Sequence, residues 1–190
     1  MLSVVEGCLR PNYSLVAREL GVTHTAVIKR VSRLLDRGLV KFSPLINVEG
    51  LGFKLVLILL EVVNDEYISK LLERFRECPR IIHMFKVLGD YNLAVLAYAE
   101  DESVLNAMLG TCMLRTANGI RRSSVIPVTS VLLGEYLRIR VPRKEYLETP
   151  CGLLCSRCVK YVRRECIGCP ATIYYRGTFS TIPPKKLGRE

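Results

Sequence analysis

Residues 14–35, SLVAREL-GVT-HTAVIKRVSRLL, predict two short helices joined by a tight turn. Gly21 stands where the first helix must turn sharply, because glycine adopts a positive φ without steric cost. Thr23 can cap the unpaired N–H groups that open the second helix. Apolar residues recur at helical spacing, at Val16, Ala17 and Leu20 and then at Val27, Val31 and Leu34. The stretch therefore predicts a helix-turn-helix.

The second predicted helix leaves a short polar and basic face outside this apolar seam. Such a face suits the major groove of double-stranded DNA. An ordinary helical hairpin with solvated charges is the alternative, and the joint presence of Ala17, Gly21 and the basic face favours DNA binding. The residues expected to contact DNA are Thr23, His24, Thr25, Ile28, Lys29, Ser32 and Arg33.

The charge of the chain is concentrated at its two ends. The 190 residues carry a net charge of +10. Residues 1–45 hold seven basic and three acidic side chains, residues 46–150 hold 13 of each, and residues 151–190 hold eight and two. Basic ends indicate a polyanionic partner such as nucleic acid.

No segment has the composition of a membrane span or of a secretion signal. The longest apolar run, residues 55–60, is far shorter than a bilayer-spanning helix. We therefore expect a cytoplasmic protein that does not contact membranes.

The middle of the chain predicts an α+β domain of the ferredoxin-like βαββαβ type. Residues 39–46, with Pro44 among them, suit an edge strand or wing that completes a winged helix-turn-helix domain over residues 1–46. One face of the later sheet is expected beneath two helices, and its second face is rich enough in Val, Leu and Ile to predict a homodimer. The expected strands are 54–63, 81–88, 93–99 and 120–128, and the expected helices are 65–75 and 102–114.

Three signatures resemble the Lrp/AsnC family of transcriptional regulators over residues 1 to about 130. They are ARELGVTHTAVIKRVSRLLDRGLVK at 17–41, NVEGLGF at 47–53 and GDYN at 89–92. The resemblance implies transcriptional regulation by a homodimer or higher oligomer, built through a dimerisation and effector domain over residues 47–135. It also implies an amino-acid-like effector bound near Gly89, Asp90 and Asn92. Asn92 stands where the family has a carboxylate, and only a short segment, residues 2–9, precedes Arg10 as a possible first helix.

Five cysteines of the tail, residues 151–190, predict a small metal-binding module after a linker over residues 136–150. Cys151, Cys155, Cys158, Cys166 and Cys169 have the spacing C-x3-C-x2-C-x7-C-x2-C. The last four form two C-x2-C pairs and can supply a tetrahedral zinc site. An iron–sulfur cluster of the 4Fe-4S type is the alternative, since a Cys-Pro pair closes the run and Cys151 is a spare ligand. Disulfides are the third possibility.

Cys78, beside Pro79, is interpreted as a small buried apolar residue.

These features together predict a sequence-specific DNA-binding regulator, modulated by a small ligand or by the metal or redox state of the cysteine cluster. The alternative is a sirohaem-decarboxylase-like enzyme on the same two-domain architecture. Residues 46–150 contain one histidine, His83, and no catalytic motif of a hydrolase or a phosphate-binding loop. We therefore expect a protein that is not an enzyme.

Overall fold

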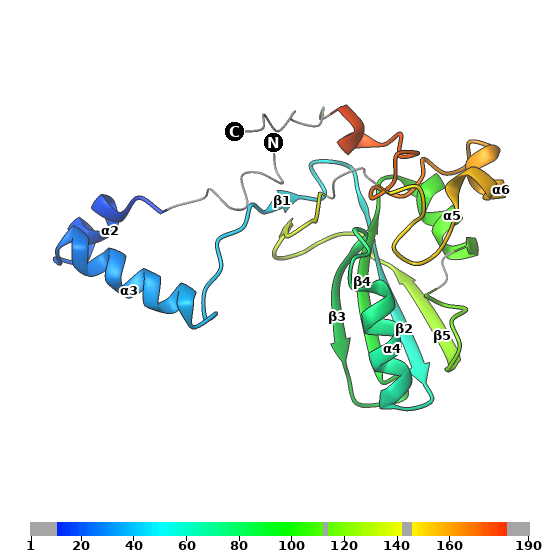
Figure 1. The fold of residues 1–190 in the computed structure, drawn as a ribbon, viewed down its shortest axis with the longest axis horizontal. Coiled ribbons are helices and arrows are strands. Elements are labelled where there is room, and N and C mark those ends of the chain that lie inside the picture. Colours follow the sequence, from blue (N-terminus) through cyan, green and yellow to red (C-terminus); the bar gives the residue numbers. More distant parts are fainter. Residues whose placement is uncertain (1–10, 112–113, 142–145, 182–190) are drawn as a thin grey trace. The chain divides into compact units, whose positions relative to one another are not determined.

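The computed structural model describes residues 11–111, 114–141 and 146–181, and the chain divides into two compact units, 1–44 and 45–190 (Figure 1). The expected first helix over residues 2–9 lies outside the described residues. The unit boundary falls two residues before the end predicted for the helix-turn-helix domain.

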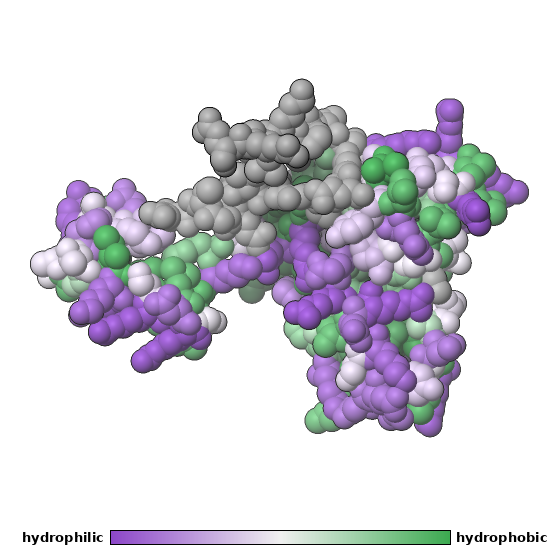
Figure 2. All heavy atoms as spheres, viewed as in Figure 1, coloured by the Kyte–Doolittle hydropathy of each residue, from purple (hydrophilic) through white to green (hydrophobic). Residues whose placement is uncertain are grey.

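The N-terminal unit consists of helix α2 (Tyr13–Glu19) and helix α3 (His24–Asp36), within one residue of the predicted ends. Gly21 has the expected positive φ, +62°. The Thr23 hydroxyl accepts a hydrogen bond from the Ala26 N–H at 3.2 Å, as a helix cap does. Ala17 and Val27 are the described residues that this unit buries. Of the other residues predicted for the apolar seam, Val16 and Val31 are half-buried, whereas Leu20 and Leu34 are exposed. Exposed apolar side chains of this unit lie beside charged ones (Figure 2).

The expected wing is absent from the described N-terminal unit. Helix α3 ends at Asp36, Gly38 follows with φ +66°, and the Leu39 N–H donates to the Leu34 carbonyl at 2.9 Å. Residues 39–45 then form no strand. The strand β1 (Ile46–Asn47) pairs instead with β6 (Tyr136–Leu137) of the second unit. Pro44 lacks the N–H that a longer paired strand would require.

The second unit contains the predicted βαββαβ series. The strands β2 (Lys54–Val62), β3 (Ile81–Lys86), β4 (Leu93–Ala99) and β5 (Ile120–Pro127) form an antiparallel sheet in the order β3-β4-β2-β5. The helices α4 (Asp65–Phe75) and α5 (Glu102–Thr111) connect them. Residues 112 and 113, which the sequence places in the second helix, are outside the described part.

The main core lies between the helices and one face of the sheet. Alternate residues of β2, such as Val56 and Leu60, are fully buried there with Leu71 and Phe75 of α4. Because side chains alternate along a strand, Leu55 points to the other face. The helices therefore cover one face of the sheet, as predicted.

The second sheet face is covered at one end by the chain's own tail. Phe53 stacks on Tyr98, with ring centroids 5.2 Å apart, and Phe179 contacts Phe53 edge-on at 5.7 Å. The other members of this second buried cluster are Val48, Leu55, Ile139 and Tyr175. The remainder of the face has partly or largely exposed apolar side chains, namely Leu57, Leu59, Phe85, Leu96 and Ile126.

The C-terminal segment packs on the sheet domain as short elements: η1 (Cys155–Arg157), α6 (Val159–Val162) and η2 (Thr178–Thr181). Residues 136–141, expected as part of a linker, belong to the fold instead. Tyr136 and Leu137 pair with β1, and Ile139 is buried because it fills the second cluster. Within the described ranges, no helix has the length and apolar character needed to span a bilayer.

Candidate DNA-binding surface and cysteine cavity

Helix α3 separates an inner apolar side from an outer polar side. Val27 is buried, whereas Lys29 and Arg33, four residues apart, are exposed. This spacing places the two cations on the same face of the helix. All seven residues expected to contact DNA are exposed: Thr23, His24, Thr25, Ile28, Lys29, Ser32 and Arg33.

Tyr13 adds a contact that the sequence pattern did not indicate. Its ring lies edge-on to the ring of His24, with centroids 6.1 Å apart. Tyr13 begins α2 and His24 begins α3, so this contact joins the first turns of the two helices. The sequence signal for this contact is weak. It consists only of an aromatic residue at the start of one helix and a histidine at the start of the next, and no periodic pattern connects the two.

The expected effector turn, residues 89–92, joins β3 to β4. Gly89 and Asp90 are exposed, and Gly89 has a φ of +136°. The Asn92 amide instead faces the backbone. It accepts a hydrogen bond from the Val62 N–H and donates one to the Val62 carbonyl, both at 2.7 Å. The three expected effector residues therefore differ in surroundings, and Asn92 holds the end of β2.

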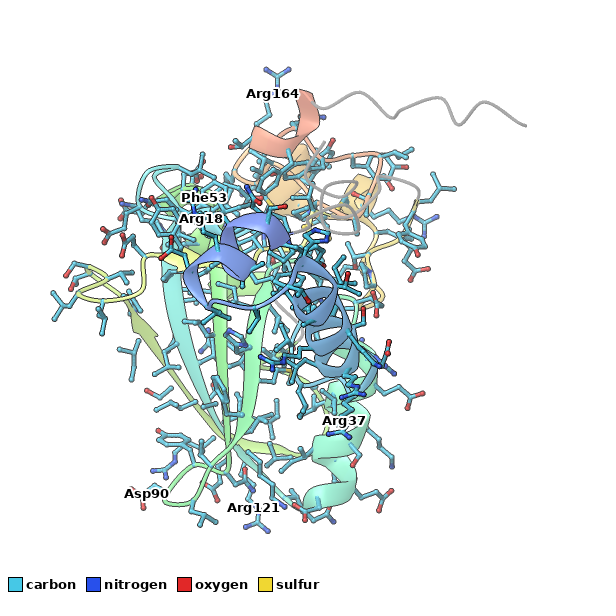
Figure 3. The ribbon with its side chains drawn as sticks, turned by 90° about the vertical axis from the view of Figure 1, so that its left-hand side faces the viewer. Arg18, Arg37, Phe53, Asp90, Arg121 and Arg164 are labelled. Atoms are coloured by element: carbon cyan, nitrogen blue, oxygen red, sulfur yellow. The ribbon has the colours of Figure 1, made fainter. Side chains whose placement is uncertain are left out.

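Basic and aromatic side chains surround this turn. The Arg122 guanidinium lies over the Tyr91 ring, 4.8 Å from its centroid, and donates to the Asp90 carbonyl at 3.4 Å. Asp90 and Arg121 lie at the end of the sheet that is remote from Phe53 (Figure 3). Arg121 and Arg122 are also paired with Glu61, at 3.8 and 3.4 Å, so the surroundings of the turn contain both cations and carboxylates.

The five predicted ligands of the tail line one cavity of about 100 Å³. They are present as free thiols, and Cys155 is buried. Cys78, which the sequence suggested was merely a small buried residue, lines the same cavity. Cys78 follows α4 in the sheet domain, so only the tertiary structure reveals that it joins the tail cysteines.

The sulfur atoms are not arranged as a ready-made zinc site. Among the residues that the structure describes, no three His, Cys, Asp or Glu side chains are placed to hold one metal ion. The two thiols of the second C-x2-C pair each accept a backbone hydrogen bond, Cys166 from Gly168 and Cys169 from Ala171. Burial nonetheless raises the pKa of Cys166, and that of Cys169 to about 11. Both thiols are therefore protonated at neutral pH and would lose their protons to a bound metal.

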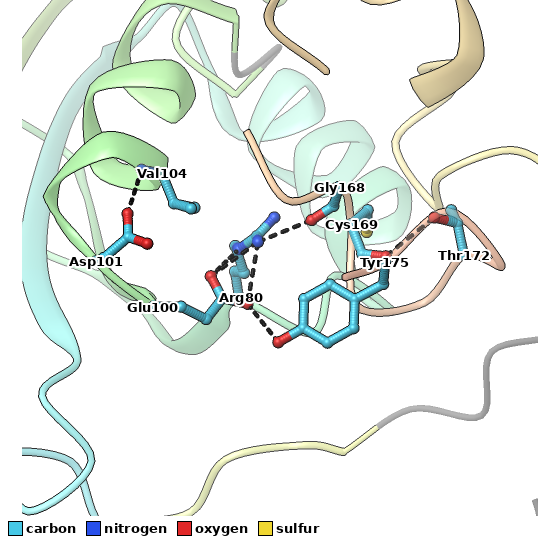
Figure 4. A network of polar contacts seen from close by, with 8 residues as sticks. All are labelled: Arg80, Glu100, Asp101, Val104, Gly168, Cys169, Thr172 and Tyr175. Carbon is cyan, nitrogen blue, oxygen red and sulfur yellow. Dashed lines mark hydrogen bonds and ion pairs between the residues drawn. The ribbon is translucent and has the colours of Figure 1, made fainter. Parts of the chain in front are cut away.

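A buried ion pair holds the second C-x2-C pair against the sheet domain (Figure 4). Arg80 contacts Glu100 at 2.8 Å, and the two side chains are only 9% and 4% exposed. Arg80 also donates to the Gly168 carbonyl at 2.9 Å, and the Tyr175 hydroxyl donates to Glu100 at 2.9 Å. The network connects residues before β3 and after β4 with two parts of the tail.

Gly168 is required by the geometry of this attachment. Its φ is +88°, and a Cβ added there would lie 2.8 Å from the Tyr174 carbonyl oxygen. A side chain at this position would displace the loop between Cys166 and Cys169.

No protein-family model matches the chain. A transcriptional regulator of the helix-turn-helix type, Ptr1 of Methanocaldococcus jannaschii, is 28% identical over 110 residues, which are 57% of this chain and 74% of Ptr1. Escherichia coli AsnC superposes with a TM-score of 0.57 at 16% identity, over 70% of this chain and 89% of AsnC. The chain has the fold of the Lrp/AsnC regulators.

A third comparison adds a liganded relative of the same fold. A transcriptional regulator from Neisseria meningitidis, solved as a complex with L-methionine, superposes with a TM-score of 0.57 at 16% identity, over 69% of this chain and 86% of that protein. The names of the curated relatives and of the structural neighbours support an Lrp/AsnC-type transcriptional regulator. They agree with the prediction that the chain is not an enzyme and lend no support to the tetrapyrrole-enzyme alternative.

Proposed function

We propose that this chain is a sequence-specific DNA-binding transcriptional regulator of the Lrp/AsnC type. The observation that carries the proposal is the exposed polar and basic outer face of α3, a helix whose N-terminus is capped by Thr23. Lys29 and Arg33 serve as phosphate or base contacts, and Thr25 and Ser32 supply short hydroxyl groups for the groove. The regulator names of the relatives support the same reading.

The test compares two double variants that remove the same charge. Lys29→Ala/Arg33→Ala is expected to fold but to lose DNA affinity, and the slope of log K against log salt should fall by about one unit per lost phosphate contact. Lys70→Ala/Lys86→Ala removes two exposed cations of the sheet domain and serves as the control. Fluorescence anisotropy with genomic fragments at several salt concentrations measures both. An unchanged salt slope in the α3 variant would show that another surface binds DNA.

The regulator acts as a homodimer, or a higher homo-oligomer, in this proposal. The exposed apolar part of the second sheet face supports it, because a face with Phe85 and Ile126 half exposed is unusual for a monomer. Two copies pairing sheet to sheet would remove these side chains from water.

Modulation completes the proposal. An amino-acid-like effector near residues 89–92 is supported by the exposed carboxylate of Asp90, the nearby Arg122 and the methionine-bound neighbour. The amide of Asn92 contributes by shaping the turn, since both of its polar atoms already bind Val62. Metal or redox state at the cysteine cavity is the second proposed input, with zinc or an iron–sulfur cluster as its cofactor.

A further inference from the structure

The cysteine cavity has walls from both the tail and the sheet domain. Cys78 follows α4, and Met108 and Thr111 come from α5. The remaining thiols belong to the tail. Any group that fills this cavity would therefore contact both parts of the second unit.

The size of the cavity is informative about its occupant. Four thiolates around one zinc ion, each at about 2.3 Å from the metal, lie only about 3.8 Å apart and leave no space between them. Here six cysteines line a cavity of about 100 Å³, enough for several water molecules. A cavity of this size with a cysteine lining fits an occupant that brings its own atoms into the centre, as the sulfide ions of an iron–sulfur cluster do.

The surroundings also suit such a cluster. The N–H groups of Gly168 and Ala171 already point at two of the thiols, and hydrogen bonds to the sulfur atoms stabilise bound clusters. The Cys151 thiol lies 3.2 Å from the Thr149 hydroxyl. Apart from Arg80, which is neutralised by Glu100, the described lining has no charged side chain to compete with metal binding.

We propose that this cavity holds one 4Fe-4S cluster and that Cys78 supplies the thiolate ligand from the sheet domain. Cys166 and Cys169 supply two of the other ligands and one further tail cysteine supplies the third, which leaves two of the six thiols unused by a four-cysteine cluster. The cluster then bridges the tail to the loop after α4. This inference rests on one part of the proposed function, the metal centre at the cysteine cavity. It does not require that the chain binds DNA.

The test reconstitutes the full chain without oxygen, with ferric iron, sulfide and a thiol reductant in one sample and zinc alone in another. We expect about four iron and four sulfide per chain with visible charge-transfer absorbance. The variant Cys166→Ala/Cys169→Ala should lose the iron. Tight binding of one or two zinc ions, without stable incorporation of iron and sulfide, would overturn the cluster assignment, as would equal iron in both proteins.

Cys78 is tested separately. Cys78→Ser should lower the iron content at least twofold and increase proteolysis of the tail, whereas Met108→Leu, which changes another cavity-lining side chain, should retain both properties. Circular dichroism of the metal-free proteins verifies that each variant folds. Full iron, sulfide and spectrum in folded Cys78→Ser would exclude Cys78 as a ligand. DNA affinity, measured on the same samples, reports independently on the proposed function.

Discussion

At the scale of single residues, Arg80 and Glu100 have the most demanding environment among the described charges. Both are buried, and their pairing is completed by hydrogen bonds to Gly168 and from Tyr175. Burying one charge without the other is expensive, because its desolvation is then uncompensated. This pair therefore determines where the tail attaches as well as how stable the second unit is.

We expect Glu100→Gln to destabilise the protein by about 3–5 kcal/mol, since Arg80 keeps its charge and loses its counter-ion. Glu66→Gln is the matched control, because it breaks a pair that is at least as short, Glu66 with Lys70 at 2.6 Å, on the exposed surface of α4. The control should unfold like the wild type. Urea denaturation at one fixed protein concentration measures both. Equal midpoints for the two variants would mean that the buried pair contributes no more than a surface pair.

At the scale of elements, Asn92 links the end of β2 to the start of β4. The ladder between these strands runs to Leu60 opposite Leu93, and β2 has an irregular register with β5 at Glu61 and Val62. The Asn92 amide extends the pairing to Val62 by offering one donor and one acceptor. A side chain thus replaces backbone pairing where the ladder ends.

Asn92→Asp is expected to cost about 1–3 kcal/mol at neutral pH, because an ionised carboxylate cannot donate to the Val62 carbonyl. The protonated carboxyl can, so folding raises the pKa of the new side chain. The variant should lose least stability below the pKa that the new carboxyl has in the unfolded chain. It should lose more as the pH rises through the higher pKa that this carboxyl has in the folded protein. Asn64→Asp is the control, since Asn64 only accepts from the Tyr67 N–H at the start of α4, where a carboxylate is favourable. Thermal unfolding measured between about pH 3 and about pH 8 tests this prediction. A loss of stability that does not depend on pH, or that the control shares, would contradict the role assigned to Asn92.

At the scale of the whole molecule, the second face of the sheet has one end that the tail covers and another part that stays exposed. Tail residues Tyr175 and Phe179 bury the end with Tyr98, whereas Phe85 remains 50% exposed on β3. Stable interfaces bury more than about 1,000 Å² in total, and the open part of this face is the surface that we expect to supply that area.

Phe85→Glu is therefore expected to convert the proposed homodimer to a monomer at micromolar concentration, because dimer formation would bury an unpaired charge. Leu72→Glu places the same charge at a residue of similar exposure, 52%, on α4 and should leave the dimer intact. Light scattering coupled to size-exclusion chromatography gives the mass of each. A monomeric wild type, or a Phe85→Glu variant that stays dimeric, would place the interface elsewhere.

Local patterns in the sequence predicted the longer helices and strands of this protein. Helical periodicity, a turn glycine and a capping threonine predicted α2 and α3 to within one residue, because each signal acts over a few neighbouring positions. Apolar, β-prone segments likewise predicted the strands of the sheet domain, and helical spacing of apolar residues predicted its two helices. The prediction of a wing was wrong because no strand in the described part of the chain lies beside Pro44 and its neighbours, and strand pairing depends on a distant partner.

Only the tertiary structure decided which distant residues meet. It brings Cys78 to the tail cysteines across more than seventy residues, joins Arg80 to Glu100, and turns the expected linker into a strand and a buried Ile139. It also directs the Asn92 amide to the backbone of Val62 rather than outward. The spacing of residues along the chain indicates local secondary structure, but it does not indicate which distant segment will pack beside it. The helix-turn-helix could therefore be predicted from the sequence, whereas the composition of the cavity required the fold.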